Sequence, residues 1–463
     1  MRKIYTLLAV LLFGGCSLSS PTDPYRPVVV PEAPLAVANM EVPSAEPPEG
    51  PLTLAEAITV AMANNPELAA ANWAYRAAEA RHDFALGARL PRFSVIGSYA
   101  RHLDEQRLLP VRQPGDPAIL SRDIVSGDLV LTMPIFTGGR LVSQIEAVEL
   151  LQRAAGHRLA RSREELVFNV SSLFFGILAQ RQVIESLEFS ARTLEQHLDR
   201  VDALIASQKA ARVDRLRTEV RLADIRQQLV QQENVMAIQH RALASVLGSE
   251  EHGEALSIEG GLELEQETSV PRLETALQTA RSGRDDYLAA RRALEAQARQ
   301  VDVARAARSP TVFVQGSYGG RWGIGDTTGT GEDLDDVGRI GLGAEIPIYE
   351  GGQISAQIQE QRANLAAARE RLRELELQIR LDVETALLDV ESARQRIVAI
   401  QTSVEQAQES LRIEREKYDL GRGAIVDVLD AQAALLDSQT NYYRALADYH
   451  VALARMKLAI GEP

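Results

Sequence analysis

Two hydrophobic periodicities follow one another along this chain. From Leu52 to Arg89 apolar residues recur at helical spacing, and over Phe93–Tyr99 and Val125–Met133 they alternate with polar ones. A period of about 3.6 residues predicts helix, and a period of two predicts strand. We therefore expect one helical segment over 52–89, followed by two strands of about ten residues, a length typical of a membrane barrel wall.

The same succession of patterns occurs twice. The strand motif at 90–99 returns at 309–318, preceded by a helical segment over about 271–308. An internal repeat of this length predicts one architecture used twice, over 52–248 and 271–463, with a connecting segment at 249–270. Each second strand is followed by a proline and a pair of glycines: Pro134, Gly138 and Gly139, then Pro347, Gly351 and Gly352.

These motifs predict how each strand pair passes into a helix. Proline cannot donate a hydrogen bond to a sheet, so we expect Pro134 and Pro347 to end their strands. Glycine adopts backbone conformations that other residues avoid, so each Gly-Gly pair permits a sharp turn into the helix that follows.

Two very long helices are predicted after the turns. No proline occurs from Arg140 to about Ser207, and neither proline nor glycine occurs from Gln353 to about Asp419. At 1.5 Å per residue each helix is roughly 100 Å long, about three times the thickness of a bilayer. Shorter helices over 213–247 and 425–460 then return. In the second long helix two rows with a seven-residue period predict coiled-coil packing; they contain Val383, Val390, Ile397, Val404 and Leu411, and Ile379, Ala386, Ala393, Ile400 and Ala407.

Composition narrows the possible functions. The formal net charge is −14, which argues against a nucleic-acid partner. The seven histidines are scattered and show no metal-binding or catalytic spacing, so we expect no enzyme, no metal and no cofactor. The glycine-rich segment 319–331 lacks a phosphate-binding motif, and we expect a mobile extracellular loop. The acidic residues beside it could hold calcium or be solvated: Glu332, Asp333, Asp335 and Asp336.

The N-terminus has the order of a secretory signal over residues 1–15. Arg2 and Lys3 precede an apolar run, which ends in two glycines before Cys16, the one cysteine of the chain. This arrangement resembles a bacterial lipoprotein processing site, which implies cleavage before Cys16 and attachment of lipid to it. Ordinary cleavage without lipid is the alternative. Residues 16–51 are rich in proline and predict an extended, lipidated tether.

Four strands cannot close a membrane barrel by themselves, because the smallest such barrels have about eight. Open strand edges in hydrocarbon would leave backbone groups unpaired, at a cost of several kcal/mol each. If the strands lie in a membrane, several chains must share one barrel, and the long helices must project from it as a hollow cylinder. A soluble, half-buried sheet would show the same alternation of residues.

The chain resembles the TolC-type outer-membrane efflux protein family from Leu52 to Gly461, most specifically in the two Gly-Gly turns and in the segment Tyr418–Gln432. The resemblance implies a mostly α fold with a membrane β-barrel contribution: a trimeric, twelve-stranded barrel above an α-helical tunnel. It also implies an export channel in the outer membrane of a Gram-negative bacterium, lipid-anchored and projecting into the periplasm. Its partners would be a periplasmic adaptor protein and an inner-membrane pump, most similar to the resistance–nodulation–division class.

The same resemblance points to residues of the periplasmic entrance. Asp427 and Asp430 are three residues apart, hence on one helix face, and would ring the narrowest point as a cation-favouring constriction. The alternative is a pair of acids favoured by the start of a helix. Tyr418 and Asp214 match positions that hold the entrance closed, although Tyr418 could also be coiled-coil filler. A basic partner is missing at Gly423, and the adjacent Arg422 is a possible substitute.

The two tips where the helices reverse are expected to dock the adaptor. Gly421 would supply the tight reversal in the second tip, and Gln208 stands in the equivalent place in the first. Exposed apolar residues and nearby polar ones are the candidate contacts, with plain packing within the tip as the alternative. They are Leu420, Ile425 and Val426, together with Lys209, Arg212 and Arg422.

Two other functions compete with the efflux duct. One is a lipid-anchored coiled-coil scaffold without a pore, but a scaffold has no use for alternating strands or Gly-Gly turns. The other is the outer-membrane component of a type I protein secretion system. A duct of this kind takes its substrate from its pump, which is a separate protein.

Overall fold

The structure is a computed structural model that describes residues 50–462 apart from 109–118, 250–256, 264–269 and 325–334. The described residues belong to one unit, Pro43–Pro463. The predicted signal peptide, Cys16 and nearly all of the tether lie outside the described residues. So do Glu332, Asp333 and residues 325–331 of the predicted glycine-rich loop. The expected start of that loop is wrong, because residues 319–323 belong to the strand Thr311–Gly323.

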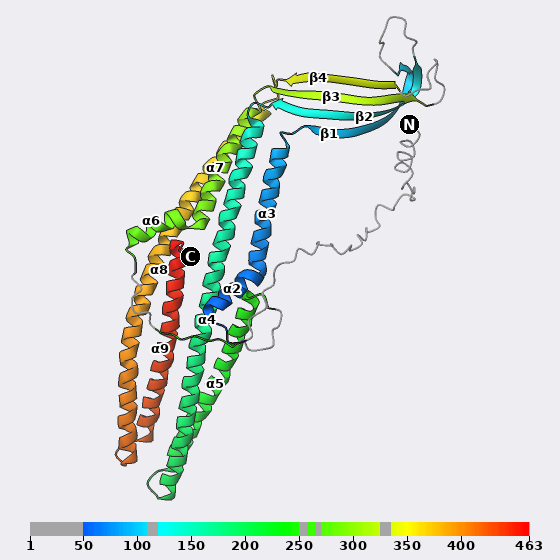
Figure 1. The fold of residues 1–463 in the computed structure, drawn as a ribbon. Helices are drawn as coiled ribbons and strands as arrows, with labels where there is room; N and C mark the ends of the chain where they lie inside the picture. The colour runs from blue at the N-terminus through cyan, green and yellow to red at the C-terminus, as the bar shows by residue number, and fades with distance from the viewer. Residues whose placement is uncertain (1–49, 109–118, 250–256, 264–269, 325–334, 463) are drawn as a thin grey trace. The chain divides into compact units, whose positions relative to one another are not determined.

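The same six elements occur twice in the same order (Figure 1). The first set is α2 (Leu54–Asn64), α3 (Pro66–Gly87), β1 (Arg92–Arg107), β2 (Leu120–Phe136), α4 (Arg140–Ala206) and α5 (Arg212–Val246). The second is α6 (Leu273–Gly283), α7 (Asp285–Ala306), β3 (Thr311–Gly323), β4 (Asp335–Glu345), α8 (Gln353–Asp419) and α9 (Ile425–Ile460). The two long helices, α4 and α8, have 67 residues each, as the missing prolines predict.

The prediction of a single helix over 52–89 is wrong, because the chain breaks at Asn65. Pro66 disfavours helical backbone at the residue before it, and Asn65 has φ −65° and ψ 122°. Its side chain then caps α3 by accepting a hydrogen bond from the amide of Leu68 at 2.9 Å. The second repeat breaks in the same way at Arg284, with φ −67° and ψ 115°.

Both breaks hold the end of a return helix. The side-chain amide of Asn65 donates to the carbonyl of Val246 at 2.8 Å, and the guanidinium of Arg284 donates to that of Ala459 at 3.4 Å. The chain passes so close that only glycine fits beside each break. A Cβ on Gly248 would lie 2.3 Å from the carbonyl oxygen of Asn64, and one on Gly461 would lie 2.8 Å from the amide of Arg284.

The four strands form one antiparallel sheet in the order β1-β2-β3-β4. Pro347 follows β4, but the expectation that Pro134 ends its strand is wrong, since β2 continues to Phe136. β1 pairs with β2 only as far as Thr132, so no residue of β1 lies opposite Pro134. The missing N–H of this proline therefore leaves no acceptor on β1 unpaired. A register shift against β3 follows directly, between Pro134 and Phe136, as expected for proline in a strand.

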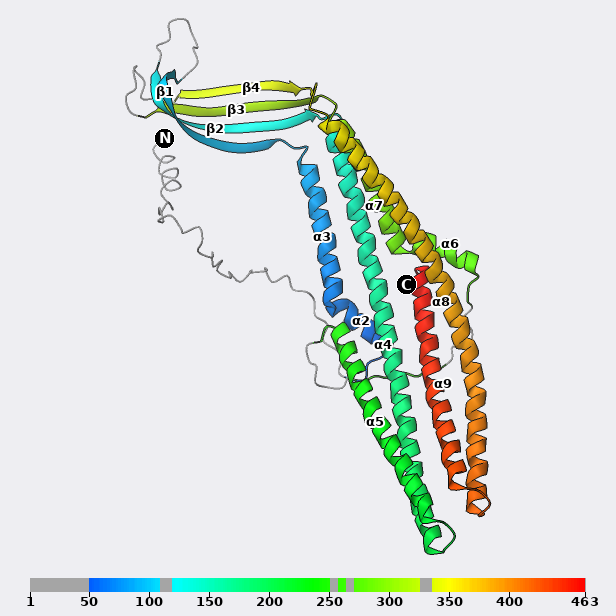
Figure 2. The same ribbon diagram turned by 180° about the vertical axis from the view of Figure 1, so that it is seen from behind.

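The helices pack side by side, and both views show α4 between its neighbours (Figure 2). Toward the sheet, α4 lies between α3 and α7, and α7 contacts α8. Toward the tips, α4 lies between α5 and α9, and α9 contacts α8. Thus α3 and α5 form one edge of this layer, and α8 forms the other.

Heptad positions supply the packing between helices. Val383, Val390 and Ile397 of α8 are at most 1% exposed and belong to a cluster with α6 and α9. Burial of each such side chain stabilises the protein by about 1.5–3 kcal/mol. By length and composition one window of α4 is apolar enough to cross a membrane. Half of that window is buried in the layer, and a packed core helix has the same composition.

Candidate functional site at the helical tips

The tips are two matching reversals, α4 to α5 and α8 to α9. Gln208 and Gly421 both adopt left-handed backbone, with φ of 61° and 68°. In each tip the backbone amide of the following residue donates a hydrogen bond back to the preceding helix. The amide of Lys209 donates to the carbonyl of Leu204, and the amide of Arg422 donates to the carbonyl of Lys417, both at 2.8 Å. Gln208 thus takes the conformation of glycine, although left-handed backbone costs other residues about 1–2 kcal/mol.

Asp214 and Asp427 occupy the same position in the first turns of the two return helices. The carboxylate of Asp214 accepts a hydrogen bond from the amide of Ala211, and that of Asp427 from the amide of Ala424, both at 3.3 Å. Asp430 is exposed and bonds to none of the described residues. Within one chain Asp427 therefore caps a helix, the alternative that the sequence left open, while its exposed side remains accessible to other chains.

Tyr418 lies in the seam between the two helix pairs. It is 8% exposed, and its ring tilts against that of His197 on α4, with centroids 5.4 Å apart. Its hydroxyl and the Nε2 of His197 are buried without a hydrogen-bond partner among the described residues. Burial raises the pKa of Tyr418, and the carboxylates of Asp214 and Asp419 add to that shift. No hydrogen bond joins Tyr418 to Asp214 within the described chain.

The surroundings of His197 disfavour the charged form of its imidazole. Burial lowers its pKa, and the guanidinium groups of Arg415 and Arg200 lower it further, while Asp419 acts in the opposite direction. A proton on this imidazole would be placed in a largely buried seam beside two cations. The two helix pairs therefore pack best when His197 is uncharged.

Two bonds between the helix pairs were missed by the sequence analysis. Arg200 of α4 donates to Asp419 at the end of α8 at 2.8 Å. Gln432, which is 7% exposed, donates to the backbone carbonyl of Ser190 at 3.1 Å and to its hydroxyl at 3.2 Å. Arg422, the expected substitute for a base at 423, is exposed and makes no such bond to the described residues. Partners separated by 219 and 242 residues leave no local signal.

A cavity of about 710 Å³ lies between the two tips. Several of the expected docking residues line it, namely Gln208, Lys209, Leu420, Gly421 and Ile425, together with Tyr418, Asp214 and Asp419. Arg212, Arg422 and Val426 lie outside its lining. The expected exposure of Ile425 is wrong: the residue is 2% exposed, because it packs into a cluster formed by α4, α5, α8 and α9. Leu420 is 70% exposed.

At the opposite ends of the long helices, both Gly-Gly turns have left-handed backbone. The φ angles are 62° and 88° at Gly138 and Gly139, and 61° and 86° at Gly351 and Gly352. Gly138 also lacks space, since a Cβ there would lie 2.1 Å from the Cβ of Ser309. The described residues contain no group of three or more histidine, cysteine or acidic side chains that could hold a metal ion.

Comparison with known proteins shows which family shares this architecture. The family of outer membrane efflux proteins matches residues 57–249 and 276–462. Outer membrane protein TolC of Vibrio cholerae is 21% identical over 410 residues, which cover 88% of this chain and 90% of that protein. Outer membrane protein TolC of Escherichia coli is 23% identical over 364 residues, 74% of this chain and 70% of that one.

Solved structures share the fold at lower identity. A structure of CusC has a TM-score of 0.76 at 18% identity and covers 89% of this chain and 92% of its own. The open state of the MtrE outer membrane channel of Neisseria gonorrhoeae has a TM-score of 0.73 at 19% identity, with coverage of 88% and 89%.

Proposed function

The chain belongs to the outer membrane efflux protein family and is an outer-membrane export channel, and we propose that three copies form the exit duct of a tripartite efflux system. In this proposal a periplasmic adaptor docks at the helical tips, and an inner-membrane pump supplies substrate and energy. The observation that carries the proposal is that one chain forms a sheet and a helical layer, both with open, apolar edges.

The sheet supports a shared barrel. Its strands have 11 to 17 residues, enough to cross the hydrocarbon core, which needs about 9–11. Its outer strands, β1 and β4, each have one neighbour in the described chain. Val95, Ile340 and Leu342 are 77–80% exposed, which suits a lipid-facing surface and is costly in water. Three copies side by side would give each open edge a partner.

The internal repeat indicates what covers the edge of the helical layer. Phe168 and Phe175 of α4 lie beside α9, and Phe175 stacks on His450 at 4.4 Å between centroids. Leu381 and Leu388 occupy the same two positions of α8, yet they are 57% and 70% exposed. α9 lies against the two phenylalanines of α4, whereas no helix of the described chain covers Leu381 and Leu388 in the same way.

A second copy can supply that helix through α5, the counterpart of α9. Leu429 of α9 is 9% exposed, whereas Leu216, at the same position of α5, is 50% exposed. Val230 on the same helix is 66% exposed. Packing α5 of one chain against α8 of the next would bury both apolar edges in the manner that the chain already uses between α4 and α9, and a third copy would close the ring.

Closure of the ring would bring Asp427 and Asp430 of the three chains together at the tips. Both side chains are exposed in the single chain, so they are available to line an entrance. Carboxylates gathered at a constriction favour cations and bind divalent ions. Tyr418 and the tip bonds of Arg200 and Gln432 would hold this entrance narrow until partners open it.

Planar-bilayer conductance tests the proposal. We expect small cation-selective steps from the wild type, and larger, less selective steps from the double variant Asp427→Asn/Asp430→Asn. Asp437→Asn is the matched control, because this exposed carboxylate lies on the same helix two turns further from the tip. Unchanged steps in the double variant would remove these carboxylates from the entrance. Absence of conductance from intact trimers would favour the scaffold.

A further inference from the structure

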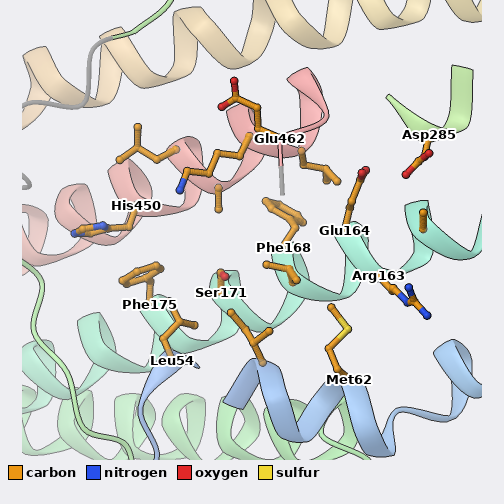
Figure 3. A pocket seen from close by; sticks show the side chains of 17 residues that line it. Leu54, Met62, Arg163, Glu164, Phe168, Ser171, Phe175, Asp285, His450 and Glu462 are labelled. Carbon is orange, nitrogen blue, oxygen red and sulfur yellow. The ribbon is translucent and has the colours of Figure 1, made fainter. Parts of the chain in front are cut away.

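A cavity of about 630 Å³ lies between α2, α4 and α9, close to the middle of α4 (Figure 3). The export function proposed above makes no use of it. Its volume is within the range of about 300–1,000 Å³ that is typical of sites for small organic ligands. Most of its lining is apolar, and includes Leu54, Ile58, Met62, Phe168, Phe175 and Leu453.

Aromatic rings form one flat part of the lining. Phe175 stacks on His450 with an interplanar angle of 13°, and a ring nitrogen of His450 lies 3.0 Å from the carbonyl oxygen of Glu263. The stack is therefore held on both sides, by α4 and by the connecting segment. Phe168 lies further along α4, toward the acidic end of the cavity (Figure 3).

Two carboxylates stand at the opposite end, Glu164 on α4 and Asp285 at the start of α7 (Figure 3). Glu164 accepts a hydrogen bond from Arg161 at 3.2 Å, and Asp285 lies 2.7 Å from the Nδ1 of His157. Burial raises the pKa of Glu164; Arg161 opposes this shift, and the charges of Asp285 and Asp286 add to it. Arg161 also pairs with Glu165 at 2.9 Å, so one guanidinium is shared by two carboxylates.

Ser171 adds a polar group to the lining of the cavity. It is 5% exposed, and its hydroxyl bonds to none of the described residues. In Figure 3 this side chain points from α4 into the space that α9 covers. Because Ser171 lines the cavity, its hydroxyl is available to bond to a ligand there.

Glu164 has no acidic counterpart at the matching position of the second repeat. Glu164 has the same position in α4 that Leu377 has in α8, and Phe168, Ser171 and Phe175 correspond to Leu381, Glu384 and Leu388. The lining as a whole carries three carboxylates and two cations, and Arg163, one of the cations, points away from the cavity in Figure 3.

We propose that this cavity binds an amphipathic organic cation, with its apolar body against Phe168 and Phe175 and its charged group at Glu164 and Asp285. The hydroxyl of Ser171 is placed to bond to a polar group of the same ligand. The site lies within one chain, so it does not depend on how three chains close the duct.

Equilibrium binding of rhodamine 6G, a fluorescent hydrophobic cation, to the purified trimer tests the site. We expect saturable binding with one site per chain at mildly alkaline pH. Glu164→Gln should weaken it roughly two- to fivefold, the effect of one partly exposed ion pair. Glu165→Gln is the matched control, because Glu165 also pairs with Arg161, at 2.9 Å, but does not line the cavity. This control should bind like the wild type.

A second probe and a second variant complete the test. The hydrophobic anion 1-anilinonaphthalene-8-sulfonate should bind at least tenfold more weakly than the cation. Ser171→Leu should weaken cation binding by removing the hydroxyl and occupying part of the cavity, and circular dichroism would verify its helix content. Equal affinities of the Glu164 and Glu165 variants, or preference for the anion, would overturn the proposal. Bilayer conductance of the same variants should be unchanged, so failure here is distinguishable from failure of the channel itself.

Discussion

Replacement of Arg284 by methionine probes the joint that ends the second return helix. Arg284 is 3% exposed and donates from Nε and Nη2 to Asp286, at 2.9 and 2.7 Å, and from Nη2 to Asp382 at 3.0 Å. Methionine fills much of the same space but leaves two partly buried carboxylates without their cation. Removing one partner of a buried ion pair costs about 3–5 kcal/mol, and we expect the lower end because both acids retain contact with solvent.

The dependence of this loss on pH follows from Asp286. Burial alone would raise the pKa of Asp286, but bonds from Arg284 hold it below the usual range. A depressed carboxyl pKa stabilises the folded state above the unfolded pKa, and the contribution disappears as pH falls through the folded value. The difference between wild type and Arg284→Met should therefore be largest near neutrality and shrink in acid.

Unfolding followed by far-ultraviolet circular dichroism in detergent would measure this effect. Arg281→Met is the control, since Arg281 is an exposed arginine in the last turn of α6, which ends just before Arg284. Changing Asp286 and Asp382 to asparagine in the Arg284→Met background should restore part of the stability, because no uncompensated charge is then buried. An Arg284 variant as stable as the Arg281 control, at every pH, would refute this account of the joint.

Two further predictions concern the tips. Gln208→Gly should stabilise the first tip by about 1 kcal/mol, because it removes the strain of left-handed backbone, and Gly421→Gln should destabilise the second tip by a similar amount. Hydrogen exchange of the tip amides would measure both effects. Equal exchange rates in the wild type and the variants would show that the left-handed backbone is not strained. Because burial lowers the pKa of His197, its contact with Tyr418 is stable above the unfolded pKa and weakens as pH falls below it and through the folded pKa, so channel steps should grow in acid. His197→Phe should remove this response, whereas His240→Phe on α5, away from the tips, should retain it.

Local chemistry made most of the architecture predictable. The long helices were placed to within a residue of their observed ends, because proline and glycine act on the backbone of their own neighbours. Gly421 predicted the reversal of the chain at the second tip. The equivalent conformation at Gln208 was recognisable only through the repeat, since glutamine has no preference for it.

The sequence by itself therefore determined the order of elements, the heptad seams and the turns, all of which depend on residues within about one or two helical turns. Only the tertiary structure decided that Pro134 stays in its strand, that Ile425 is buried, and that Arg200 pairs with Asp419. These outcomes depend on which strand ends where and which helix lies opposite, and Arg200 and Asp419 are 219 residues apart. The cavity beside Glu164 belongs to the same class, because α2, α4 and α9 enclose it only after both repeats have packed together.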